Sequence, residues 1–118
     1  MIHNRYIDVL YKQPNKKPKK VRIENNLEDM RKLVGGDIKI LNYSDVLLVC
    51  NNKGKIKGLE PNVLLKNNMI YGSFFIVGDD KEKADFISLT EKQFTKFKNE
   101  LLRGNLNNKE MEDDLEWI

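Results

Sequence analysis

The chain has 118 residues, of which 40% are hydrophobic and 33% are charged, and its formal net charge is +3. This length fits one domain with a modest core, and the single cysteine and single histidine exclude an internal disulfide and a zinc site built on such ligands. No apolar run reaches the roughly 18 residues of a membrane helix, and the first residues do not resemble a secretory signal, so we expect a cytoplasmic protein.

The N-terminal part predicts a hairpin. Residues 5–11 alternate and are rich in apolar and aromatic side chains, which is typical of a strand, and residues 21–23 resume that pattern. Two prolines and several lysines between them indicate an exposed connection. We expect Ile7, Val9 and Tyr11 to form the core face of the first strand.

A short helix follows. Asn25-Asn26 supplies an N-cap, and Gly35-Gly36 supplies the left-handed stop that many helices require. Apolar residues recur at helical spacing between these two signals. A helix of about two turns is too short to be stable alone, so we expect it to pack on a sheet.

The middle of the chain predicts three strands. Residues 37–41 alternate, and residues 46–50 are apolar enough for a central strand that is buried on both faces. A turn follows in which Gly54 takes a positive φ, and residues 55–59 continue as a half-exposed strand with Ile56 on its apolar side.

The C-terminal half predicts one long strand and one helix. Residues 63–68 fit either a helical turn or an extended link, whereas residues 71–78 form an apolar strand next to 46–50. Residues 86–89 fit a last short strand or the lead into a helix. Thr90 and Gln93 form a capping box, and Gly104 ends this helix. Its apolar stripe consists of Phe94, Phe97 and Leu101.

Short connections favour an α+β fold, an antiparallel or mixed sheet of about five to six strands with a short central helix and a C-terminal helix packed on one face. We expect a single domain over residues 1–104 and an acidic C-terminal tail over residues 105–118.

Two charged segments are candidate binding sites. A basic segment has no acid among its residues and suits an anionic partner such as nucleic acid, although it equally fits a solvated loop. It comprises Lys12, Lys16, Lys17, Lys19, Lys20 and Arg22. The acidic tail resembles a docking peptide for a protein partner, and it equally fits a segment that folds back on its own domain. Its candidate contact residues are Asp113, Asp114, Leu115 and Trp117.

No group of residues indicates catalysis, so we expect no enzyme activity, no cofactor and no metal site. His3 is the only histidine and lies near the start of the chain, while Cys50 ends an apolar strand and fits a buried thiol. The acidic residues between Asp79 and Asp85 do not follow a calcium-loop register. Gly35-Gly36 lies at the wrong end of a helix to hold a phosphate.

Several motifs occur in a fixed order: Val34-Gly35-Gly36, Asn51–Lys55, Gly58–Asn62, Gly72–Gly78 and Ser88–Thr90. Over roughly residues 5–101 the chain resembles a small domain of unknown function carried by phages, plasmids and other mobile elements of bacteria. Glu60 departs from the family pattern by separating leucine from proline, and residues 12–20 are more basic than the pattern. The resemblance implies a mobile-element origin, hence the cytoplasm of a bacterial host cell, and it implies no activity.

The sequence therefore predicts a non-catalytic accessory protein that binds a host protein, with anti-CRISPR or antirestriction inhibition as one form of that role. A nucleic-acid-binding protein that uses residues 12–22 is the first alternative. A protein that sequesters a small nucleotide between its sheet and loops is the second. We expect no membrane association.

Overall fold

The computed structural model describes residues 5–103 of the chain. The elements in chain order are β1 (Tyr6–Lys12), β2 (Lys19–Glu24), α1 (Leu27–Val34), β3 (Ile38–Tyr43), β4 (Val46–Asn51), β5 (Pro61–Leu65), β6 (Asn68–Tyr71), β7 (Phe74–Asp80), β8 (Asp85–Ile87) and α2 (Glu91–Leu102).

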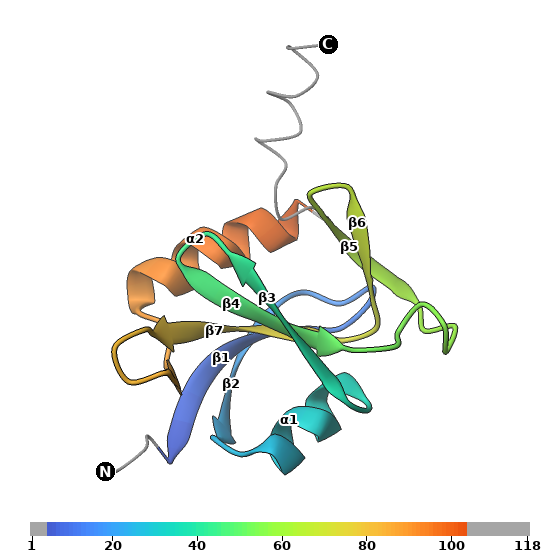
Figure 1. Cartoon of the computed structure of the whole chain (residues 1–118). Coiled ribbons are helices and arrows are strands. Elements are labelled where there is room, and N and C mark those ends of the chain that lie inside the picture. The colour runs from blue at the N-terminus through green and yellow to red at the C-terminus, as the bar shows by residue number, and fades with distance from the viewer. Residues whose placement is uncertain (1–4, 104–118) are drawn as a thin grey trace.

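Six of the strands form one antiparallel sheet (Figure 1). Its order is β2-β1-β7-β4-β3, and β8 pairs with the C-terminal end of β7. The remaining strands, β5 and β6, form a separate hairpin. The predicted α+β class is confirmed, as are the β1–β2 hairpin and the pairing of β4 with β7.

The two helices cover opposite faces of this sheet. Alternate residues of β7 point to different cores: Phe74 and Ile76 pack with α2 and the β5–β6 hairpin, whereas Phe75 and Val77 pack with α1. The prediction that both helices lie on one face is therefore wrong. The central strands are apolar on both faces, so each face needs its own cover from water.

The helix boundaries follow the predicted signals. Asn26 is the N-cap of α1, and its side chain accepts a hydrogen bond from the Asp29 N–H at 2.7 Å. Gly35 ends α1 with a φ of 82°. Thr90 and Gln93 form the predicted capping box of α2, and Gly104 lies outside the described residues.

The predicted strand over residues 55–59 is wrong. Hydrogen bonds from Lys57 N to Lys53 O and from Leu59 N to Gly54 O fold this segment into successive turns, and Ile56 is left 85% exposed. Gly54 does not take a positive φ. Position 54 requires glycine because there is no room for a side chain: a Cβ there would lie 2.6 Å from the Tyr71 carbonyl oxygen.

The undecided segment 63–68 belongs to the β5–β6 hairpin. The predicted strand 71–78 is in fact two, because Gly72, with a φ of 85°, breaks it between β6 and β7. In β1 the predicted core residues Ile7 and Val9 are buried, whereas Tyr11 is half-buried and its hydroxyl donates to the Leu33 carbonyl at 2.9 Å.

A buried asparagine fixes the end of α1 against the sheet. The Asn51 side chain donates to the Val34 carbonyl at 3.1 Å and accepts from the Lys53 N–H at 2.8 Å. Carbonyls in the last turn of a helix have no partner within the helix, so this side chain satisfies a group that would otherwise be buried unpaired. The position of α1 therefore depends on Asn51.

We predict that Asn51→Ala lowers the free energy of unfolding by about 1–3 kcal/mol, because the Val34 carbonyl stays buried without a partner. Urea unfolding followed by circular dichroism measures this change. Asn52→Ala is the matched control, since Asn52 is exposed and bonds to Asp37 through its backbone N–H. Equal unfolding midpoints for the two variants would contradict the role given to Asn51.

Candidate functional site

Strand β3 lies at one end of the sheet and pairs with β4 alone among residues 5–103. Its outer N–H and C=O groups face away from β4, and such an edge is a template for an added strand. The opposite end of the sheet is β2, which carries Lys19, Lys20 and Arg22. Because charged side chains discourage edge pairing, β3 is the more receptive of the two edges.

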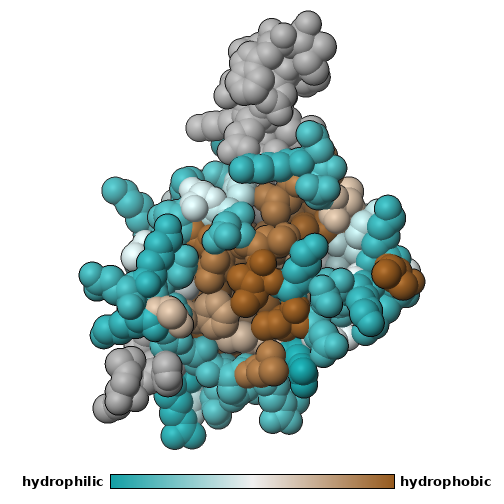
Figure 2. Space-filling view, viewed as in Figure 1, coloured by the Kyte–Doolittle hydropathy of each residue, from teal (hydrophilic) through white to brown (hydrophobic). Residues whose placement is uncertain are grey.

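An apolar groove extends from β3 across β4 to β7 and β8 on the face that α1 covers. It has a volume of about 400 Å³, and its polar rim includes Asp79 and Asp85. Ile40 is 47% exposed and Leu27 is 48% exposed, so much of this surface faces water. Figure 2 shows apolar side chains gathered over the centre of this side of the molecule. The apolar lining residues are Leu27, Met30, Ile38, Ile40, Leu47 and Phe86.

A second groove lies on the other face of β3, between β3, β4 and the β5–β6 hairpin. It has a volume of about 430 Å³ and is lined by Lys39, Lys55 and Lys66 together with several asparagines. None of its lining residues is acidic. This lysine groove therefore favours negatively charged groups.

Cys50 forms part of the floor of the lysine groove. It is buried, as predicted, and burial raises the pKa of its thiol. A buried thiol that holds its proton is a poor nucleophile, so Cys50 contributes packing to the groove.

The structure places the residues of the predicted basic segment in different environments. Lys12 is only 7% exposed, and its Nζ donates to the Gln13 carbonyl at 2.7 Å and to Asn62 Oδ1 at 3.0 Å. Burial lowers the pKa of this ammonium group. Lys12 therefore joins β1 to the start of β5 and does not belong to the exposed basic surface.

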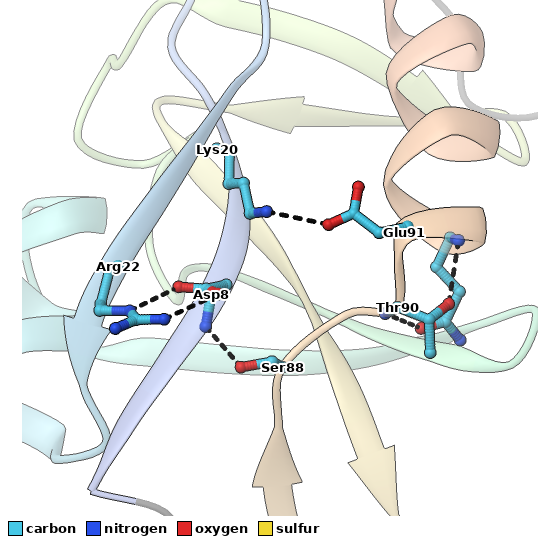
Figure 3. Close-up of polar contacts among 7 residues, drawn as sticks. Asp8, Lys20, Arg22, Ser88, Thr90 and Glu91 are labelled. Carbon is cyan, nitrogen blue, oxygen red and sulfur yellow. Dashed lines mark hydrogen bonds and ion pairs between the residues drawn. The ribbon is translucent and has the colours of Figure 1, made fainter.

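Two further cations of this segment have acidic partners within the fold (Figure 3). Arg22 donates to Asp8 at 2.8 Å, and this hydrogen bond holds the pKa of the Asp8 carboxyl below its ordinary value. Lys20 lies 3.1 Å from Glu91 and also sits over the Phe94 ring. Both pairs lie at the surface, so they reduce but do not remove the attraction of Lys20 and Arg22 for a polyanion.

The remaining residues, Lys16, Lys17 and Lys19, are exposed and form no ion pair with any described residue. The other predicted site residues, Asp113, Asp114, Leu115 and Trp117, lie outside the described residues. His3 does so as well.

The described range offers no arrangement for metal chemistry. Within residues 5–103, no group of three His, Cys, Asp or Glu side chains is placed to hold a metal ion. The acidic residues near β8 form a turn, in which Asp80 accepts a hydrogen bond from the Lys83 N–H at 3.2 Å. Neither α1 nor α2 has the length and apolar run that a bilayer crossing requires.

Sequence reasoning missed the apolar groove. Ile38 and Ile40 follow the alternation of a strand, which does not tell whether a side chain meets a core or water. The one available signal was the length of α1, because eight residues cover little of a sheet. Leu27 and Phe86 join the groove through tertiary packing that no local pattern reveals.

Comparison with known proteins gives one match. A family model described as a domain of unknown function (DUF3846) matches residues 7–102. No curated protein and no solved structure matches the chain. The matched range includes every residue that lines the apolar groove and the lysine groove.

Proposed function

Because the chain belongs to the DUF3846 family, a family of unknown function, we propose a role from the geometry of its surface. The protein is a non-catalytic accessory protein of a phage or other bacterial mobile element, and it acts by binding a host protein. Inhibition of a defence system, such as a CRISPR or restriction complex, is the form of this role that we favour. The likeness of its ordered motifs to domains carried by mobile elements supports the origin.

The observation that carries the binding role is the apolar groove beside the unpaired edge of β3. A partner strand laid along β3 gains main-chain hydrogen bonds from the edge, and its side chains enter the grooves on either face. Main-chain pairing supplies affinity for any extended segment. The apolar and lysine grooves supply the discrimination between partners.

We predict that Ile40→Asp abolishes capture of the host partner, because it places a charge in the apolar groove. Pull-downs from the bacterial host lysate with the full chain as bait, followed by mass spectrometry, measure this loss. Ile40 is 47% exposed, so its replacement leaves the core intact.

Ile56→Asp is the matched control. It makes the same chemical change at a residue that is 85% exposed in the turn before β5 and lines neither groove. The proposal requires a stoichiometric partner that the wild type and Ile56→Asp retain and Ile40→Asp loses. Recovery of no partner, or of a partner that all three capture equally, would contradict it.

Nucleic-acid binding is the second candidate, and it is supported by the exposure of Lys16 and Lys17 on the β1–β2 connection and of Lys19 at the start of β2. It predicts salt-sensitive binding to DNA or RNA that is lost when all three lysines are replaced by Ser. The logarithm of the binding constant falls with the logarithm of salt concentration by about 0.9 for each phosphate contact, so three contacts are measurable in gel-shift titrations.

Replacing Lys81, Lys83 and Lys98 by Ser is the control, since it removes the same charge from exposed positions elsewhere. Absence of any shift at low salt, or equal losses in the two triple variants, would remove this candidate.

A further inference from the structure

The two faces of the sheet differ at the edge of β3, because one carries the apolar groove and the other carries the lysine groove. This difference restricts which segments can pair along the edge. Side chains of a strand alternate between faces, so a strand added beside β3 sends every second side chain to the apolar groove and the others to the lysine groove. The complementary segment therefore alternates apolar and acidic residues.

The last eight residues of the sequence, 111–118, contain this alternation at residues 114–117. They read Met-Glu-Asp-Asp-Leu-Glu-Trp-Ile. In an extended conformation Leu115 and Trp117 share one face, and Asp114 and Glu116 share the other. The acidic face is complementary to Lys39, Lys55 and Lys66, and the apolar face is complementary to Ile38 and Ile40.

We propose that residues 111–118 add to the sheet of their own molecule as an antiparallel strand along the outer edge of β3. Leu115 and Trp117 fill the apolar groove, and Asp114 and Glu116 face the lysine groove. This inference shares its site with the proposed function but does not require that a host partner exists.

One register places two apolar side chains beside the apolar groove and one acid opposite Lys39. Pairing Leu115 with Ile40 places Trp117 opposite Ile38 and Glu116 opposite Lys39. Asp113, the one acid on the apolar side, then lies opposite Asn42, which is exposed and is not part of the apolar groove. Asp114 lies opposite Leu41, which lines the lysine groove, and Ile118 is the one apolar residue on the acidic side. Directly opposed side chains have Cβ atoms roughly 4.5–5.5 Å apart, within reach of an ion pair. A shift of one residue would turn the carboxylates toward the apolar groove.

The connection is long enough and runs in the required direction. The Tyr43 hydroxyl donates to Glu100 at 2.7 Å, so the Tyr43 end of β3 lies beside the last turn of α2. Residues 104–110 span up to roughly 23 Å when extended, which allows the chain to pass from the end of α2 to the neighbourhood of Tyr43. A segment that starts there and proceeds toward Ile38 is antiparallel to β3 (Figure 1).

Occupation by the same chain has a functional consequence. It covers an apolar edge that would otherwise promote aggregation, and it obliges a host partner to displace residues 111–118. The tail and the partner then compete for one site.

Trp117 is the only tryptophan, so its fluorescence reports on this segment in the unmodified chain. We predict that Trp117 in the full chain emits at a shorter wavelength and is quenched less by acrylamide than a free peptide of residues 111–118. Both effects disappear in Ile40→Asp and persist in Ile56→Asp. They are independent of protein concentration, because docking is intramolecular.

A charge exchange tests the register without disturbing the groove. Lys39→Glu and Glu116→Lys each reduce the protection of Trp117, and the double variant restores it, because the pair is then re-formed with its signs reversed. Emission of the full chain equal to that of the free peptide would overturn the proposal, as would protection that survives Ile40→Asp. Protection that appears only as concentration rises would assign the segment to a second copy and would overturn the intramolecular form.

These outcomes are distinct from those of the pull-down. The fluorescence measurement involves no partner. A protected Trp117 in a protein that captures nothing would therefore contradict the proposed function and leave this inference standing. An unprotected Trp117 in a protein that captures a partner through Ile40 would contradict this inference and leave the proposed function standing.

Discussion

The structure depends on the need to cover a sheet that is apolar on both faces. β4 and β7 bury alternate residues in two separate cores, so one helix alone cannot shield them. On one face α2 and the β5–β6 hairpin together cover the sheet. On the other face α1 has only eight residues, about 12 Å of helix, while five strands at about 4.8 Å spacing are wider. The uncovered remainder, from β3 across to β8, is the apolar groove.

Residues of the sequence motifs hold this arrangement together. Gly35 ends α1, and Asn51 fixes that end to β4. Asn62 donates to the carbonyls of Lys12 and Gly72 at 3.0 and 2.9 Å, and Ser88 accepts from the Asp8 N–H at 2.7 Å. Each motif thus has a role in the fold. The surface that we propose for binding is built largely from residues outside these motifs, such as Ile40 and Phe86.

Local signals predicted most of the secondary structure. Caps and glycine stops are short-range features, so the boundaries of α1 and the start of α2 could be predicted from the sequence. The failures are matters of tertiary context. The burial of Lys12 depends on Asn62, fifty residues away, and the exposure of Ile40 depends on how far α1 reaches. Residues 55–59, after β4, have the sequence pattern of a strand. In the structure Gly54 packs closely against Tyr71, and the segment forms turns instead.

The central claim is that the outer edge of β3 receives a further strand. Backbone amide hydrogen exchange of the full chain, resolved by residue with NMR, measures it most directly, because every second amide of β3 points away from β4. The account predicts that these outward amides are protected in the wild type and exchange freely in Ile40→Asp. Outward amides that exchange equally fast in both proteins, while those paired with β4 stay protected, would contradict it.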